Sequence, residues 1–462
     1  MLYLQWYDHS YIRRSLLLYG SVFAVNLLSM AQGMGLAFIS PIYYKLQAND
    51  TSINLVDRPL GSEQISIFVG LLHIGAILGC FIAQAIADVI GRKNLFHLLA
   101  WIILAGFLLQ ATGNLYTLYL GRFLVGLGSG GGVVIFLYAA EISEIHNRAS
   151  TATITSIMFA VGRLYAYCIG KTVSARLYCF LCAAPMALCI VLIVSIVPES
   201  PFYLVEKKQD TEALKVLYKL RPTEKVAEDI RDIKILTSAK KIQLKGILTD
   251  YVSRKALLIC LWVRFLAIFS GVVIVVGFLG VILDFPNGHL SGDTYAIIVG
   301  GLKVISGCST SLFVDNIGRR TLLITCLLIT VVCHTITGIY FSLKYSNYKY
   351  IDDWEFVVVV SVAIYGLLQT LGLRMLAGLV LGEMLPNDAK PLAAPIVTAF
   401  GFAIGLVTSI CFPLLEANSL LNHLFFAMSF TCLVGAAISY MYIPETKQKS
   451  LLEIQAILKE NM

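Results

Sequence analysis

Four basic side chains lie inside stretches that are otherwise apolar and long enough to cross a membrane: Arg163, Arg264, Lys303 and Arg374. A charge at bilayer depth costs at least ~2.5 kcal/mol. No acidic residue lies at comparable depth to pair with these four. A cation that can neither face lipid nor find a partner must face water, backbone carbonyls or an anionic ligand. The sharpest hypothesis is a central cavity of positive potential that selects an anionic or strongly polar solute.

Two structural alternatives stay open for these cations. A long basic side chain near the end of a span can extend to the membrane surface. We favour this for Arg264, toward the cytoplasmic end of its span, and it is also open to Lys303, toward the outer end. Arg163 and Arg374 lie nearer the middle, where a cavity-facing role competes with hydrogen bonding between helices.

Catalytic chemistry finds no support in the sequence. The apolar stretches hold no paired carboxylates, no metal-ligand spacing and no nucleophile with a base, so we expect neither an enzyme nor a metal or cofactor site. Gly126-x-Gly128-x-x-Gly131 matches a dinucleotide fingerprint, but no strand precedes it and no acidic residue follows it. These glycines favour close packing of helices instead.

Three short polar patterns occur twice at nearly one offset, of 227, 242 and 246 residues. The pairs are Asp88-x-x-Gly91-Arg92-Lys93 with Asp315-x-x-Gly318-Arg319-Arg320, Glu141 and Arg148 with Glu383 and Lys390, and Pro198-Glu199-Ser200 with Pro444-Glu445-Thr446. A half-chain repeat with an even number of helices per half predicts two bundles of the same topology, with a solute site between them.

Each pattern has a physical role in a short turn at the cytoplasmic face. Glycine permits the tight turn, the basic residues hold it on the anionic inner surface, and aspartate caps or pairs with a neighbouring helix end. Glu141 with Arg148, and Glu383 with Lys390, lie where ion pairs between helices could latch the two bundles and break when the chain opens inward. A static brace is the alternative for each residue.

The composition requires lipid around most of the chain. Of its 462 residues, 58% are apolar and only 14% charged, which is too apolar for a soluble protein. A hydrocarbon core of ~30 Å needs about 20 apolar residues per helix. Twelve such runs cover 15–40, 64–88, 95–116, 117–140, 151–172, 176–197, 256–283, 295–314, 321–343, 355–385, 391–417 and 419–443. We expect an all-α membrane protein of twelve transmembrane helices in two pseudo-symmetric six-helix bundles.

The distribution of charge predicts the orientation. Of 35 Lys and Arg residues, 13 fall between Lys207 and Lys255. By the positive-inside rule this segment and both termini are cytoplasmic. A net charge of +7 would suit nucleic acid, but the cations lie on one side of the spans, so the expected partner is membrane lipid and not nucleic acid. Asn49 opens a glycosylation sequon in the first outer loop. The expected parts are a cytoplasmic N-terminus (1–14), a first bundle (15–197), a cytoplasmic helical linker (198–255), a second bundle (256–443) and a cytoplasmic tail (444–462).

The motifs, taken in order, resemble the sugar porter family of the major facilitator superfamily over nearly the whole chain. Besides the doubled Asp-x-x-Gly-Arg pattern, the resemblance rests on Gly121-Arg122, Tyr138-x-x-Glu141, Pro198-Glu199-Ser200-Pro201 and Pro444-Glu445-Thr446-Lys447. Gln32-Gly33-Met34-Gly35 is most similar to the insect trehalose and glucose transporters of that family. The resemblance implies the facilitator fold, alternating access by rocking of two halves, and hexoses, disaccharides or polyols as solutes.

The chain departs from the family where a sugar would bind. In the seventh span only Ser270-Gly271 remains of the family's amide-rich pattern, and Gly277 and Phe278 replace two gate tyrosines. Lys303 replaces an asparagine and Ser156 a glutamine. Residues 374–378 replace Gly-Pro-x-Pro-Trp, so a helix break and a tryptophan platform should both be missing. The candidate substrate-binding residues are Gln32, Ser156, Arg163, Ser270, Lys303 and Arg374.

Three functions follow from these observations. The first is facilitated diffusion of a hexose or a disaccharide such as trehalose, the second is transport of an anionic or other non-sugar polar metabolite, and the third is a sensor that retains the fold without transport. The resemblance associates proton symport with a carboxylate in the first span, and residues 15–40 contain none, so uniport is expected. We expect a monomer in the plasma membrane, with a small polar solute as its ligand.

Overall fold

The computed structural model describes residues 2–50, 54–56, 58–144, 147–238, 244–285, 288–316, 318–385, 389–445, 447 and 453. Every regular element in this part of the chain is a helix. The first half contains α1 (Leu2–Ala37), η1 (Ser40–Ile42), α2 (Tyr43–Gln47), α3 (Ser62–Ile90), α4 (Arg92–Gln110), α5 (Leu115–Gly130), α6 (Gly132–Ile142), α7 (Arg148–Thr172) and α8 (Ala175–Ile196).

Short helices join this half to the second one. They are α9 (Pro201–Glu206), α10 (Asp210–Leu220), α11 (Thr223–Ser238) and α12 (Leu244–Thr249). The second half contains α13 (Tyr251–Phe269), α14 (Val272–Gly277), α15 (Leu279–Ile282), α16 (Gly292–Asn316), α17 (Arg319–Tyr345), η3 (Ile351–Trp354), α18 (Glu355–Leu368), the π-helix η4 (Gln369–Leu373), α19 (Arg374–Met384), α20 (Lys390–Ala417) and α21 (Leu421–Tyr442).

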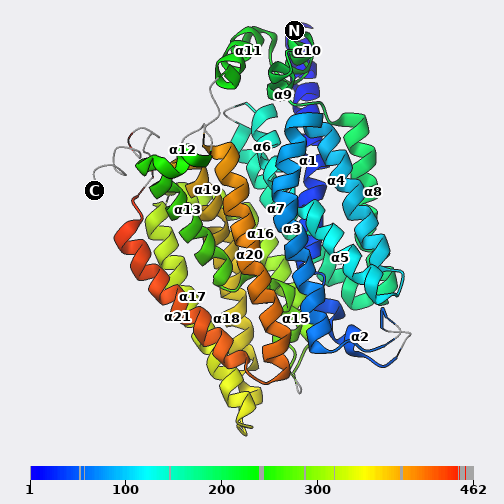
Figure 1. Cartoon of the computed structure of the whole chain (residues 1–462), viewed down its shortest axis with the longest axis vertical. Coiled ribbons are helices and arrows are strands. Elements are labelled where there is room, and N and C mark those ends of the chain that lie inside the picture. The colour runs from blue at the N-terminus through cyan, green and yellow to red at the C-terminus, as the bar shows by residue number, and fades with distance from the viewer. Residues whose placement is uncertain are drawn as a thin grey trace.

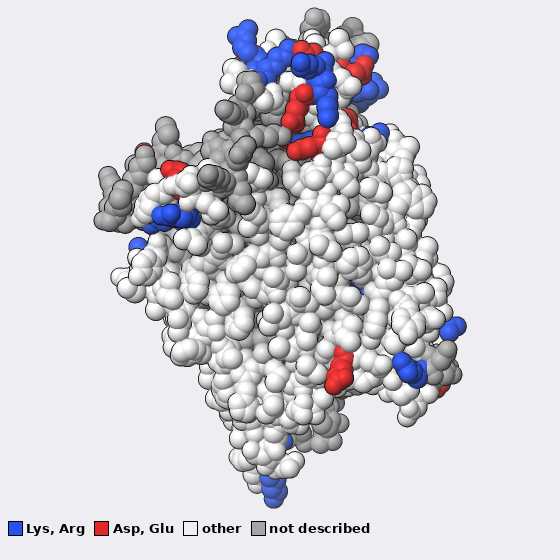
Figure 2. Space-filling view, viewed as in Figure 1, with Lys and Arg blue, Asp and Glu red and all other residues white. Residues whose placement is uncertain are grey.

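Eleven segments of the described chain are long and apolar enough to cross a membrane by length and composition. They coincide with eleven of the twelve expected spans. The remaining span, 295–314, is occupied by α16, a 25-residue helix that packs against α7. Figure 2 shows the result on the surface: Lys, Arg, Asp and Glu gather toward the two ends, and the wall between them is almost free of charge.

The two ends of the molecule differ. Helices α9, α10 and α11 and the N-terminus of α1 lie at one end, called here the linker end (Figure 1). The loop helix α2 lies at the other, the opposite end (Figure 1). Asn49, just after α2, is exposed there.

Two helix pairs join the halves: α3 packs along α20, and α7 packs along α16. Within the first half, α3 and α5 approach through glycine. A Cβ on Gly79 would lie 2.1 Å from the carbonyl oxygen of Leu127, and one on Gly126 would lie 2.1 Å from that of Leu72. The prediction that the glycines after residue 125 serve helix packing is therefore confirmed.

Three predicted spans contain irregular backbone near their centres. The fourth is divided at Gly131, and the seventh at Ser270 and Gly271 and again at Phe278. In the tenth, a five-residue π-helix ends directly before Arg374. The sequence led us to expect no helix break here, and the span does run continuously from Glu355 to Met384, although it contains this π-helical turn. A π-helical turn changes the direction of the side chains that follow it and is common at functional sites.

Candidate functional site

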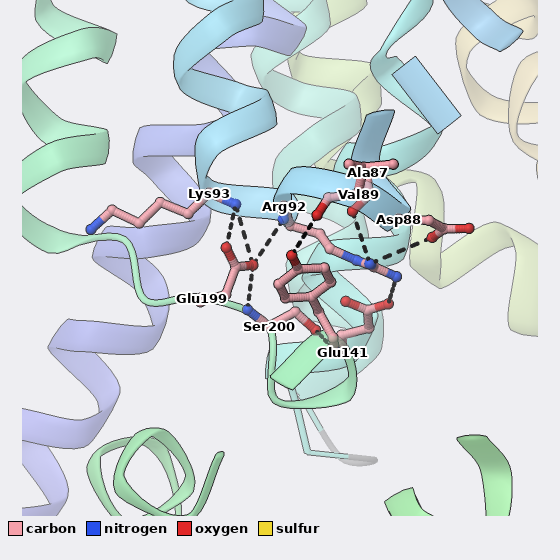
Figure 3. A network of polar contacts seen from close by, with 9 residues as sticks. Ala87, Asp88, Val89, Arg92, Lys93, Glu141, Glu199 and Ser200 are labelled. Carbon is pink, nitrogen blue, oxygen red and sulfur yellow. Dashed lines mark hydrogen bonds and ion pairs between the residues drawn. The ribbon is translucent and has the colours of Figure 1, made fainter. Parts of the chain in front are cut away.

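A polar network fastens the linker end of the first half (Figure 3). Arg92 is 5% exposed, and its guanidinium lies 3.2 Å from a carboxylate oxygen of Glu141 and 3.6 Å from one of Asp88. It also donates a hydrogen bond to the carbonyl of Ala87. We expected this basic residue to lie on the lipid surface, and that was wrong for Arg92. A carboxylate buried on α6 draws it into the protein.

Glu199 caps the first turn of α4. Its carboxylate accepts hydrogen bonds from the backbone N–H of Arg92 at 2.8 Å, of Lys93 at 3.3 Å and of Ser200 at 2.8 Å (Figure 3). The first N–H groups of a helix have no partner within it, and the helix dipole favours an anion there. The segment after α8 is thus attached to the start of α4 from 107 residues away.

The second half repeats this arrangement. Arg319 lies 3.1 Å from Glu383, and Glu445 accepts from the backbone N–H of Arg319 at 2.8 Å and of Arg320 at 3.1 Å. Lys93 and Arg320 donate to carbonyls of the last helix in their own halves, those of Val194 and Tyr440. In the described structure these ion pairs join helices of one half, so a latch between the halves remains a hypothesis. Lys390 begins α20, and the side chains of Arg148 and Asp315 lie outside the described part.

The glycines of the two motifs serve different needs. Gly91 has φ 89° and ψ 170°, a conformation that only glycine adopts readily, whereas Gly318 has φ −61°. A Cβ on Gly91 would lie 2.4 Å from a Glu199 oxygen, and one on Gly318 would lie 2.3 Å from a Glu445 oxygen. The turn explains only the first glycine. Space for the capping carboxylate explains both.

The halves touch through polar and aromatic contacts at the opposite end. Tyr43 donates to Glu416 at 3.0 Å, and the N–H of Gly280 donates to the hydroxyl of Ser40 at 2.9 Å. Tyr167 donates to the carbonyl of Val276 at 2.6 Å. Phe278, at one of the expected gate positions, meets Tyr43 edge to face with ring centroids 5.8 Å apart. The structure is closed at this end by α2, α7, α14 and α20.

The interruption of the seventh span is held by a histidine. Gly271 has φ +99°, which frees the carbonyl of Ser270 from the helix, and His334 of α17 lies with Nε2 2.7 Å from that oxygen. Ser270 is 1% exposed, and its hydroxyl donates to Ala267 within its own helix. Ser270 therefore shapes the backbone here through its carbonyl, a role the sequence did not indicate.

Two of the predicted cations meet at one ring. Arg163 of α7 and Arg374 of α19 place their guanidinium carbons 5.0 Å and 3.5 Å from the ring centre of Phe159, so the contact crosses from one half to the other. Arg163 is 2% exposed and Arg374 half-buried. Cation–π contacts contribute about 0.5–2 kcal/mol, less than the several kcal/mol that burying an unpaired charge costs.

Lys303 lies near the first of these cations, Arg163. It is 3% exposed, and a Cβ on Gly366 of α18 would lie 2.5 Å from its Cε. The charge of Arg163 acts on both Lys303 and Arg374. Lys303 follows the start of α16 by eleven residues, about 16 Å at 1.5 Å per residue. A buried side chain at that depth does not reach the outer surface.

Arg264 joins the same region from α13. A Cβ on Gly401 of α20 would lie 2.4 Å from its Nε, and its charge acts on Arg374. Thirteen residues separate it from the start of α13, about 20 Å of helix. We favoured extension to the cytoplasmic surface, but the side chain instead packs against a neighbouring helix.

The two remaining predicted binding residues, Gln32 and Ser156, form no hydrogen bond with these cations in the described structure. The amide nitrogen of Gln32 donates to the carbonyl of Ser129 at 2.8 Å, where the fourth span is interrupted. Ser156 is half-buried on α7, two turns before Arg163. Sequence analysis missed Phe159, Tyr43, Glu416 and the capping role of Glu199 and Glu445. The doubled Pro-Glu pattern was the one available signal for the last two. The described residues contain no cluster of three or more potential metal ligands.

Comparison with known proteins gives a consistent result. The family model described as "Sugar (and other) transporter" matches residues 21–458. The probable metabolite transport protein CsbC of Bacillus subtilis is 26% identical over 412 residues, which cover 87% of this chain and 88% of that protein. The facilitated trehalose transporter Tret1 of Culex quinquefasciatus is 25% identical over 440 residues, covering 94% and 84%.

Solved structures show the same architecture. The inward open conformation of the xylose transporter XylE from E. coli superimposes with a TM-score of 0.79 at 19% identity, covering 95% of this chain and 99% of that one. The proton:xylose symporter XylE bound to 6-bromo-6-deoxy-D-glucose gives a TM-score of 0.76, also at 19% identity. The expected fold of two six-helix bundles is confirmed.

Proposed function

The chain belongs to the Sugar (and other) transporter family of major facilitator carriers, and from that premise we propose that it moves a small polar solute through a membrane by alternating access. The multi-pass fold, the family and its non-enzymatic character are established by the matches. The solute, the uncoupled mechanism and the orientation are the parts we propose. In that orientation the linker end and both termini face the cytoplasm. The proposed membrane is the plasma membrane.

One observation supports this mechanism most strongly. The contacts between Tyr43 and Glu416, Ser40 and Gly280, and Tyr167 and Val276 join the halves at the opposite end. The networks around Arg92 and Arg319 instead brace each half separately at the linker end. Rocking that opens the opposite end breaks the first set of contacts and leaves the second intact.

Uniport is the simplest form of this proposal. Between Tyr11 and Ala37, α1 contains no Asp or Glu, so it offers no carboxylate that could bind and release a proton during transport. A sugar is the first candidate solute, because the matched relatives include proteins named as trehalose and sugar transporters. An anionic metabolite is the second, supported by the cations around Phe159.

Reconstitution tests the proposal. The purified chain is placed in liposomes, and uptake of radiolabelled glucose and trehalose is measured with and without a protonophore. Saturable uptake that does not change with the protonophore supports a sugar uniporter. Uptake abolished by the protonophore contradicts uniport. No uptake of any sugar or polar metabolite contradicts transport and favours a sensor.

Gly378→Trp supplies a matched loss-of-function control. A Cβ on Gly378 would meet no atom within 4 Å, so a side chain introduced there starts in open space. Gly378 follows Arg374 by one helical turn and faces similarly toward the other half. The variant should fold normally and lose uptake by obstructing the path. Uptake equal to that of the unmodified chain would contradict a pathway along α19.

A further inference from the structure

Four cations within the spans have buried nitrogens without a hydrogen-bond partner among the described residues: Arg122, Arg163, Arg264 and Lys303. Nε and Nη1 of Arg163 and Nζ of Lys303 are buried, and the part of the chain that the structure describes offers them no hydrogen-bond partner. Arg374 contacts the ring of Phe159, and no described residue gives it a hydrogen bond or an ion pair. Buried charged groups normally have such partners.

Among the described residues, no acidic side chain lies at the depth of these cations to supply the missing charge. The acidic residues of the long helices lie near helix ends, as Glu63 and Asp88 do in α3, Asp293 and Asp315 in α16, and Glu355 and Glu383 in α18 and α19. Helices α7 and α13 contain none. Arg163 therefore repels both Lys303 and Arg374, and no described acidic side chain lies beside them to neutralise the charge.

Arg122 has the same two unsatisfied nitrogens as Arg163, Nε and Nη1, but its aromatic surroundings differ. It is 1% exposed on α5, and its guanidinium lies 5.4 Å from the ring centre of Phe38 and 4.9 Å from that of Phe68. Both rings belong to the same half as Arg122, and no second cation among the described residues shares them. The cations around Phe159 instead come from both halves and share a single ring.

Open space lies beside α19, one and two turns from Arg374. A Cβ built on Gly378 or Gly382 would meet no atom within 4 Å. These residues follow Arg374 by one and two turns, toward the linker end. Small residues thus leave open space beside the helix that carries Arg374.

Resting on the proposed function, we infer that Arg163, Lys303 and Arg374 bind an anionic group of the transported solute, a carboxylate or a phosphate. The guanidinium groups each present a planar pair of donors that suits two oxygens of such a group. The ammonium of Lys303 adds a third positive charge from the second half. The bound oxyanion supplies the hydrogen-bond acceptors that these buried donors lack. Because the donors come from both halves, closure around the anion would join α7 to α16 and α19.

Binding is tested by thermal unfolding of the purified full-length chain in detergent. The probes are gluconate, glucose 6-phosphate and inorganic phosphate, with glucose as the neutral comparison. We expect at least one oxyanion to raise Tm in a saturable manner. Gluconate alone would identify a carboxylate site, and the phosphates alone a phosphate site. No shift with any oxyanion, or a shift only with added phosphatidylglycerol, would overturn the inference.

The variants Arg163→Gln, Lys303→Met and Arg374→Gln assign the site. Each should lose the oxyanion-induced shift in Tm. Lys303→Met should also have a ligand-free Tm at or above that of the unmodified chain, because it removes repulsion; a packing role for Lys303 predicts the reverse. Arg122→Gln is the matched control and should keep the shift. Equal loss of the shift in Arg122→Gln, or its retention in all three variants, would overturn the inference. If the variants at the buried positions fold poorly, Arg374→Lys serves as the additional variant, because it keeps the charge at a half-buried position.

Transport in liposomes separates this inference from the proposed function. Uniport of an anion carries charge, so a valinomycin-imposed potential should alter gluconate or glucose 6-phosphate uptake and leave glucose uptake unchanged. Saturable glucose uptake without oxyanion binding would overturn the inference and leave the carrier function standing. Oxyanion binding without any uptake would support the site and contradict the carrier function.

Discussion

The phenol of Tyr43 in α2 donates a 3.0 Å hydrogen bond to the carboxylate of Glu416 in α20, and so joins two halves that are separated by most of the chain. A hydrogen bond to a charged group contributes about 1.5–3 kcal/mol. We predict that Tyr43→Phe increases the population open at the opposite end about tenfold, since 1.4 kcal/mol corresponds to a factor of ten. Labels introduced as noncanonical amino acids at Asn49 and Asn418 would report the distance. Tyr116→Phe, at a highly exposed tyrosine of α5, is the control, and an unchanged distance distribution in Tyr43→Phe would contradict the gate.

Gly91 and Gly318 should respond differently to rescue. Gly91→Ala and Gly318→Ala both place a methyl group against a capping carboxylate and should lower the apparent Tm in detergent. In Gly318→Ala/Glu445→Ala the methyl group gains space, so the second change should cost less than it does alone. Gly91→Ala/Glu199→Ala gains the same space but should remain about 1–3 kcal/mol less stable than Glu199→Ala, because φ near 89° still strains alanine. A Gly91 pair that recovers as fully as the Gly318 pair would refute this explanation.

The ion pair of Arg92 and Glu141 should be strongly coupled. Its side chains are 6% and 7% exposed, against 16% and 25% for Arg319 and Glu383. Removing one partner of a buried pair costs about 3–5 kcal/mol. We predict that Arg92→Met and Glu141→Gln each lower stability strongly. The second substitution should lower stability far less when the first is already present. A double-mutant cycle of unfolding would measure this, and the cycle at Arg319 and Glu383 should give a smaller coupling. Additive effects at Arg92 and Glu141 would exclude the pairing.

His334 should matter as a donor to the carbonyl of Ser270. His334→Leu leaves that buried oxygen without a partner, which costs about 1–3 kcal/mol. His334→Gln retains an N–H donor and should recover part of the stability and uptake. Apparent Tm and solute uptake are the measurements, with exposed His423→Leu as control. Equal behaviour of the Leu and Gln variants at His334 would show that the hydrogen bond is unimportant.

The transmembrane helices could be predicted because a run of about 20 apolar residues is enough to indicate a span, without any helical periodicity in the sequence. The doubled motifs similarly indicated two equivalent halves. The partners within those motifs could not be predicted in the same way. Glu199 meets Arg92 across 107 residues, and nothing in the local pattern specifies which helix end a carboxylate will cap.

The mid-depth site likewise contains residues that the sequence indicated and residues that it did not. Arg163, Lys303 and Arg374 stood out because charge is rare inside apolar stretches. Phe159 did not, since one aromatic residue among many gives no signal. The predicted direction of the Arg264 side chain was wrong because the distance of Arg264 from the start of its helix was underestimated. Gly401, which this side chain contacts, lies on a helix far away in sequence.

The ring of Phe159 belongs to the first half, while Arg374 reaches it from the second. Their distance must therefore change as the halves rock, and the strength of the binding site changes with it. A passive carrier obeys detailed balance, so tighter binding on one side of the membrane has to be matched by an unequal population of the empty states. The same contact that concentrates positive charge in this conformation thus sets how asymmetric the half-saturation concentrations at the two faces can be.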